Sequence, residues 1–181
     1  MMDKTPCILL LADGTLFHGT AFGKTGTAVG EICFNTGMTG YQEVFTDPSY
    51  YGQVLIMNNV HTGNYGVKEG DVESRGVKVK AVIGRNLEEK FSRIQADGSL
   101  QEYFEKENIV AINDVDTRSL VTHVRTCGAM NCIISSEGLT VEELQQKLKE
   151  VPDMDGLELA SVVSTTNSYE LGKEGSKLKV A

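Results

Sequence analysis

The sequence predicts an α/β domain with mixed sheets. The chain has 181 residues, of which 40% are hydrophobic, and this is enough for one compact domain with a sizeable core. Apolar runs typical of strands predominate in the first half. In the second half, short strand-like runs alternate with amphipathic helical patterns, which favours mixed sheets over a simple doubly wound fold.

The strands of the first half are read from short apolar runs. The run from Cys7 to Ala12 predicts a buried strand, and Asp13-Gly14 predicts a hairpin turn because both residues tolerate a positive φ. The irregular stretch 35–51 has room for only a short helix, at about 41–45. Further strands are expected at 15–19, 29–34, 53–58 and 77–84.

The second half carries three helix patterns. An i, i+3, i+4 stripe of apolar residues predicts a helix over 99–108. Asp116 or Thr117 can N-cap a second helix. Thr140 and Glu143 form the capping box of a third. Short strands are expected at 109–112 and 131–134.

Charge and hydropathy exclude two classes of partner. The chain carries 25 acidic and 17 basic residues, a net charge of -8, so the basic surface of a nucleic-acid-binding protein is absent. The apolar run near the N-terminus is too short to cross a bilayer or to serve as a signal peptide. We therefore expect a cytoplasmic protein that binds neither nucleic acid nor membrane.

The cysteines and histidines show no pattern of a catalytic or metal site. None of the four cysteines lies in a C-x-x-C pair or in the G-x-C-x-G context of an exposed nucleophile, so buried or half-buried thiols in a reducing compartment are expected. The three histidines lack H-x-H and H-E-x-x-H spacings, so we expect no metal site. The residues concerned are Cys7, Cys33, Cys127, Cys132, His18, His61 and His123.

Gly23-Lys24-Thr25 is similar to the end of a phosphate-binding loop. That loop requires G-x-x-x-x-G-K-[ST], whereas the upstream Gly19 leaves the spacing one residue short. A surface turn is therefore favoured. A free-standing nucleotide-binding protein remains an alternative, and it predicts that the chain binds ATP.

The stretch from Asn35 to Glu43 is the most informative part of the chain. It follows a predicted strand, is rich in glycine and polar residues, and precedes a second polar cluster at 46–50. Irregular loops on a rigid scaffold are common binding sites. A tight loop that needs its glycines for backbone reasons alone fits equally well.

These stretches resemble the small subunit of carbamoyl-phosphate synthetase. The resemblance runs in order from about Ile8 to Ser135 and continues more weakly to Tyr169. Its motifs are FNTGMTGYQE at 34–43, TDPSY at 46–50, GNYG at 63–66, DVES at 71–74 and DTRSL at 116–120.

The resemblance implies a β/β/α swivelling-type domain, with a strand-rich first half and a second half of helices and strands. The family's small subunit has two domains, and the second is a class I glutaminase with a Cys-His-Glu triad. On this basis residues 1–152 are the N-terminal domain, 153–176 a linker, and 177–181 the start of the glutaminase domain. The chain alone would then lack the triad and be inactive.

The resemblance also implies an enzyme and its partners. The small subunit hydrolyses L-glutamine and passes ammonia through a channel to the large subunit of the heterodimer. There ammonia, bicarbonate and two ATP give carbamoyl phosphate for arginine and pyrimidine biosynthesis, which makes the whole enzyme a ligase. No cofactor is expected in this domain, and ATP and Mg are expected on the large subunit.

Four residues are carried over as site residues. Ser49 matches the serine that contacts glutamine from across the domain interface. Gly37, Met38 and Asp47 are expected near the ammonia path or an interface, although Gly37 replaces a serine found in many relatives. No catalytic residue is expected in this chain. The alternative is a docking module that takes no part in glutamine binding.

Overall fold

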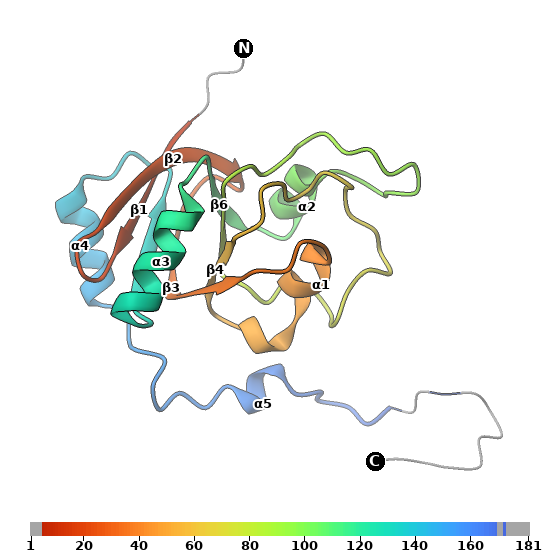
Figure 1. The fold of residues 1–181 in the computed structure, drawn as a ribbon. Helices are drawn as coiled ribbons and strands as arrows, with labels where there is room; N and C mark the ends of the chain where they lie inside the picture. The colour runs from red at the N-terminus through yellow and green to blue at the C-terminus, as the bar shows by residue number, and fades with distance from the viewer. Residues whose placement is uncertain (1–4, 170–171, 173–181) are drawn as a thin grey trace.

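The computed structural model describes residues 5–169 and 172 (Figure 1). The strand start predicted at 177–181 lies outside the described residues, as do residues 170–171 and 173–176 of the predicted linker. The strands are β1 (Pro6–Leu11), β2 (Leu16–Gly23), β3 (Thr27–Asn35), β4 (Val54–Met57), β5 (Ala81–Gly84), β6 (Val110–Asn113) and β7 (Asn131–Ser135). The helices are α1 (Tyr41–Thr46), the 3-10 turn η1 (Pro48–Tyr50), α2 (Leu100–Lys106), α3 (Thr117–Cys127), α4 (Val141–Lys149) and α5 (Ala160–Val163).

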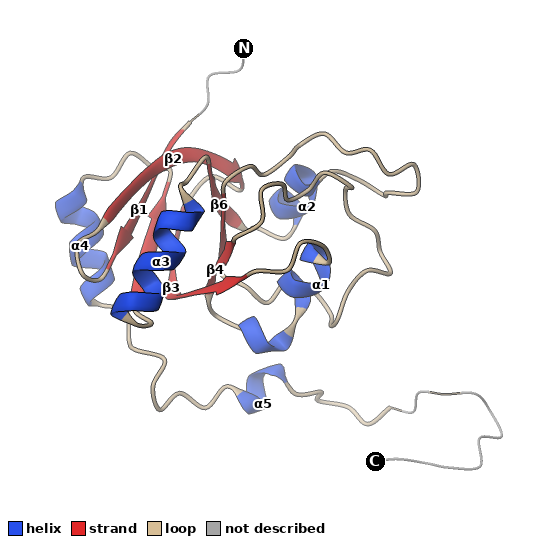
Figure 2. Ribbon diagram, viewed as in Figure 1, coloured by secondary structure: helices blue, strands red, loops and turns tan. Residues whose placement is uncertain are grey.

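The strands, drawn in red in Figure 2, form a closed barrel. Their order around it is β1-β2-β6-β5-β4-β3-β7. The two long strands each change partner along their length: β2 pairs with β1 and then with β6, and β3 pairs with β7 and then with β4. One half of the barrel is therefore antiparallel, while β3 to β6 run parallel to one another in the other half. This confirms an α/β fold with mixed strand pairing; the finer swivelling-type description stays a prediction.

The interior of the barrel is filled by alternate residues of the strands. Leu9 and Leu11 of β1 point inward and pack in one buried cluster with Ile56 of β4 and Ile83 of β5. Helix α3 adds Leu120 and two valines to this cluster. Figure 1 shows α3 running in front of the barrel strands.

The outer faces of the barrel are covered by different helices. On the antiparallel half, Leu10 and Ile133 pack against Leu144 and Leu148 of α4. On the parallel half, a second buried cluster includes residues of α1 and α2, and the rings of Phe45 and Phe104 meet edge to face at 5.2 Å. Helices α1 and α2 therefore lie beside the strands whose ends form the candidate site.

Most of the predicted elements are present, and the caps explain their boundaries. Asp116 accepts a hydrogen bond from the backbone N–H of Ser119 and begins α3. Thr140 and Glu143 form the predicted capping box of α4, and α2 begins with a second box made by Ser99 and Glu102. Each box satisfies backbone donors that the first helical turn leaves unpaired. Among the described helices, none is long and apolar enough to cross a membrane.

The strand predicted at 77–84 is wrong in its first half, because β5 begins only at Ala81. The backbone N–H of Lys78 donates to the carbonyl of Phe45, and that of Lys80 donates to the carbonyl of Gln53. Val79 is buried in the cluster around α1 and α2. The alternating apolar pattern at 77–81 therefore reflects a loop that packs against α1.

Candidate functional site

The carboxyl ends of the parallel strands carry asparagines. Asn35 ends β3, Asn113 ends β6, and Asn58 and Asn86 follow β4 and β5. In α/β sheets, ligands commonly bind outside the carboxyl ends of parallel strands, because the loops there converge. The polar, glycine-rich stretch singled out in the sequence begins at one of these strand ends. We therefore take residues 35–50, from the last residue of β3 to the end of η1, as the first candidate site and call them the α1 segment.

Asn35 connects the two ends of the α1 segment. Its Oδ1 accepts a hydrogen bond from the backbone N–H of Gly37 at 2.7 Å, and its Nδ2 donates to the hydroxyl of Tyr50 at 3.0 Å. The carbonyl of Asn35 also accepts from the backbone N–H of Asn58 at 3.0 Å. The Asn35 side chain thus joins the glycine loop to the η1 turn, and its backbone carbonyl joins both to the residue that follows β4.

The η1 turn presents Ser49 to solvent. The carboxylate of Asp47 accepts the backbone N–H of Ser49 at 2.8 Å, and Pro48 occupies the first position of the turn. Ser49 is exposed, and its hydroxyl has no hydrogen-bond partner among the described residues. Asp47 therefore shapes the turn, while the hydroxyl of Ser49 is available to a ligand.

Gly37 and Met38 lie on the exposed part of the same segment. The side chain of Met38 is 83% exposed. A Cβ added at Gly37 would come 2.9 Å from Oδ1 of Asn35, the atom that accepts the Gly37 N–H. A larger residue at position 37 would therefore require a small shift of the Asn35 amide. All four predicted site residues lie in the α1 segment, where Asp47 contacts Ser49.

The start of α1 is held by the GNYG motif. The hydroxyl of Tyr65 accepts the backbone N–H groups of Gly40 at 2.8 Å and Tyr41 at 3.3 Å. The two tyrosine rings stack at 4.2 Å, and the hydroxyl of Tyr41 donates to the carbonyl of Gly66. Burial raises the pKa of Tyr65, so its hydroxyl stays protonated near neutral pH.

The end of α1 is held by the DVES motif. Thr46 Oγ1 accepts the backbone N–H of Glu73 at 2.9 Å, and the hydroxyl of Ser74 donates to the carbonyl of Thr46 at 2.6 Å. Asp71 of the same motif pairs with Arg93 at 2.7 Å. Motifs that are well separated in the sequence therefore converge on the α1 segment, and this common support was not predicted.

The four cysteines differ in burial. Burial raises the pKa of Cys7 and of Cys33 to about 12, and it raises the pKa of the fully buried Cys132 as well. Cys127 is exposed at the end of α3, which corrects the expectation that all four thiols are buried or half-buried. It is the last residue of the helix, three residues after the buried Val124.

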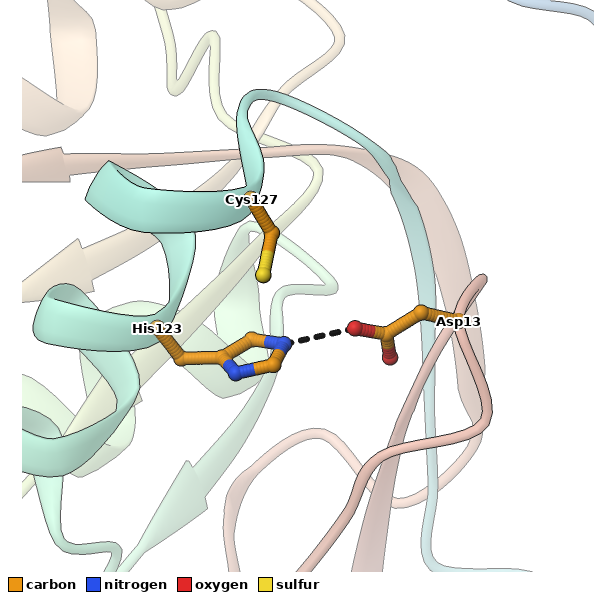
Figure 3. Close-up of side chains that lie close together, drawn as sticks. All are labelled: Asp13, His123 and Cys127. Atoms are coloured by element: carbon orange, nitrogen blue, oxygen red, sulfur yellow. Dashed lines mark hydrogen bonds and ion pairs between the residues drawn. The ribbon is translucent and has the colours of Figure 1, made fainter.

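Cys127 lies in a cluster with Asp13 and His123 (Figure 3). Nε2 of His123 lies 2.6 Å from Oδ2 of Asp13, and one ligand atom of each residue lies within 4.8 Å of the others. A hydrolytic triad needs the carboxylate and the nucleophile at different ring nitrogens. In Figure 3 Nδ1 of His123 points away from both partners, so the cluster does not form such a relay.

The Gly23-Lys24-Thr25 segment is a connection between strands. Gly23 ends β2 and Thr27 begins β3, so no helix N-terminus follows the segment. A phosphate loop needs that N-terminus to direct backbone N–H groups at the phosphates. The preference for a surface turn is confirmed. The nucleotide-binding alternative assumed a phosphate loop at Gly23-Lys24-Thr25, and the structure has no such loop there.

Comparison with known proteins identifies the family. Residues 9–134, which include nearly all of the barrel, match the family described as the carbamoyl-phosphate synthase small chain, CPSase domain. The chain belongs to this family. A carbamoyl phosphate synthase small chain from Synechococcus sp. is 46% identical over 94% of this chain and 44% of its own length. One from Thermosynechococcus vestitus is 48% identical over 92% and 44%.

The chain thus spans less than half the length of these carbamoyl phosphate synthase small chains. A solved structure, an aminopeptidase from Aneurinibacillus sp. strain AM-1, gives a TM-score of 0.39 at 14% identity over 73% of this chain and 30% of its own. That likeness is too distant to carry an argument. The family match includes the whole α1 segment, whereas the roles of Ser49, Gly37, Met38 and Asp47 remain predictions.

Proposed function

We propose that this chain is the domain of a cytoplasmic, glutamine-dependent carbamoyl-phosphate synthetase that docks the small subunit onto the large one. In this proposal the α1 segment completes the glutamine site and the start of the ammonia path. Glutamine hydrolysis takes place in a separate glutaminase domain, so this chain alone is inactive. The domain needs no cofactor, and the ATP and Mg needed for carbamoyl phosphate synthesis bind the large subunit.

The observation behind the proposal is that hydrogen bonds from other family motifs hold the α1 segment in place. Four family motifs hold an exposed serine hydroxyl and an exposed glycine loop in a fixed position. A neutral hydroxyl that can donate and accept suits the polar groups of an amino acid. Ammonia released beside this segment must be kept from bulk water, because protonation would end its use as a nucleophile.

Ser49→Ala in the complete small subunit is expected to raise the KM for glutamine about 2- to 12-fold. This range corresponds to the loss of one neutral hydrogen bond, worth about 0.5–1.5 kcal/mol. The rate with ammonia as nitrogen source is expected to stay unchanged. Steady-state kinetics with each nitrogen source measures both.

Ser119→Ala is the matched control, because Ser119 is an exposed serine on α3, outside the α1 segment. It is expected to change neither rate. If Ser49→Ala behaves like this control, the domain takes no part in glutamine binding, and the alternative of a pure docking module is favoured.

Docking is tested separately by mixing this chain with the large subunit of a carbamoyl-phosphate synthetase. Size-exclusion chromatography with light scattering is expected to show a complex with one copy of each chain. The large subunit with bovine serum albumin serves as the control mixture. Separate elution of a chain that circular dichroism shows to be folded would contradict docking through this domain.

A further inference from the structure

We propose that Asp13, His123 and Cys127 bind a divalent transition-metal ion of the Zn²⁺ type, contrary to the expectation from the sequence. This site is independent of the proposed function. It lies where the β1–β2 turn meets the last turns of α3, and Figure 3 shows the three side chains directed toward one another.

The fold brings the three ligands together from two elements. His123 and Cys127 are four residues apart on α3, so their side chains project from the same face of the helix. Asp13 comes from the turn between β1 and β2, where its Oδ1 accepts the backbone N–H of Thr15 at 2.9 Å. That bond orients the carboxylate and leaves Oδ2 directed at His123.

The distances suit a small ion after a minor adjustment. Zn²⁺ bonds of about 2.0–2.3 Å to oxygen, nitrogen and sulfur in a tetrahedron place the ligand atoms about 3.3–3.6 Å apart. The three ligand atoms already lie within 4.8 Å of one another. The Nε2–Oδ2 pair, at 2.6 Å, has to open by roughly 0.7 Å for that geometry, a movement that side-chain rotation can supply.

The chemistry of the donors selects the class of ion. A thiolate and an imidazole favour Zn²⁺, Co²⁺ or Ni²⁺ over Mg²⁺ and Ca²⁺, which prefer oxygen ligands. Binding through Nε2 leaves Nδ1 to carry the ring proton of a neutral imidazole. Cys127 is the last residue of α3, where the partial negative charge of the helix end favours a cation.

The fourth coordination position is accessible. His123 and Cys127 line an open hollow of about 560 Å³ along α3, together with Ser119, Thr122 and Thr126. A water molecule or an external ligand can therefore complete the tetrahedron. Two basic residues work against affinity for a cation: Arg118 lines the same hollow, and Lys149 lines a neighbouring one with Asp13.

The test is a titration of the 181-residue chain, freed of any affinity tag and kept reduced with a non-thiol reductant. Co²⁺ is expected to bind one ion per chain with a thiolate charge-transfer band and the visible bands of a tetrahedral ion. Zn²⁺ is expected to displace it. With free Zn²⁺ at 100 times its dissociation constant, the melting temperature is expected to rise by about 5–10 °C.

Three variants assign the ligands. Cys127→Ser is expected to remove the charge-transfer band, and His123→Gln and Asp13→Asn are each expected to weaken Zn²⁺ binding at least tenfold. Asn at position 13 keeps an oxygen for the N–H of Thr15, so the turn is preserved. His61→Gln is the matched control, because His61 is an exposed histidine hydrogen-bonded to Asn86 in another loop.

Two outcomes would overturn the proposal. If the folded chain binds no Co²⁺ or Zn²⁺ at equimolar concentration, the cluster is a structural His–Asp pair beside a free thiol. If the three variants bind the ion as well as the wild-type chain and the His61→Gln control do, the metal binds elsewhere.

Discussion

Gly63→Ala is expected to lower the free energy of unfolding by about 2–4 kcal/mol, the largest effect on stability that we predict for a single methyl group. Gly63 has a φ of +99°, in the left-handed region that disfavours residues with a Cβ. An added Cβ would also lie 2.5 Å from the carbonyl oxygen of Glu88 and 3.0 Å from the side chain of Leu100. Because backbone atoms cannot move aside cheaply, the loop has to shift away from α2.

Urea unfolding followed by far-ultraviolet circular dichroism measures this change, on the assumption of two-state behaviour. Gly70→Ala is the control from the same loop, because a Cβ there meets nothing within 4 Å and its φ lies outside the left-handed region. That variant is expected to change the free energy of unfolding by less than about 1 kcal/mol, in the stabilising direction. Equal values for the two variants would contradict the steric argument.

Under the proposed function, Asn35→Ala is expected to lower glutamine-dependent carbamoyl phosphate synthesis about 10- to 100-fold in the complete enzyme, because Ser49 loses its position. The substitution removes the hydrogen bonds to Gly37 and Tyr50 together, so the glycine loop and the η1 turn lose their common support. Synthesis from ammonia is expected to persist, because ammonia bypasses glutamine hydrolysis. The ratio of the two rates is the measurement.

Two further variants distinguish an effect on the position of Ser49 from an effect on the stability of the domain. Tyr50→Phe removes only one of the two side-chain bonds of Asn35 and is expected to have a smaller effect. Asn59→Ala changes an asparagine of the next loop, which bonds to His61 and Thr62, and is expected to leave the ratio unchanged. A parallel loss of both activities in Asn35→Ala would show that the residue maintains the fold and does not position the site.

Local signals in the sequence were sufficient for α1 to α4 and for most of the strands, whereas α5 was not predicted. Capping residues such as Asp116 and Thr140 bond to the backbone three residues further on, so a short stretch of sequence is enough to predict their effect. The closed barrel could not be predicted in this way. It depends on pairings such as that of Thr27 with Ser135, which lie 108 residues apart and are selected by the whole core.

The candidate site shows the same division. The polar, glycine-rich stretch marked the α1 segment, and the resemblance to a family selected Ser49. The function of Asn35 was not visible, because an asparagine at the end of a strand is common and its partner Tyr50 is fixed only by the fold. Asp13 and His123 are 110 residues apart, so only the spacing of His123 and Cys127 on a predicted helix was a signal for their cluster.

The closure of the barrel also limits how another protein can bind this one. Each of the seven strands has a hydrogen-bonded neighbour on both sides along at least part of its length. Sheets with a free edge can recruit a strand from a partner or from a second copy, and that route underlies both β-augmentation and edge-to-edge aggregation. The described residues offer few unpaired backbone N–H and C=O groups to which another strand could pair. At the described barrel we therefore expect recognition by a partner to depend on side chains presented by loops and helices, and not on extension of the sheet.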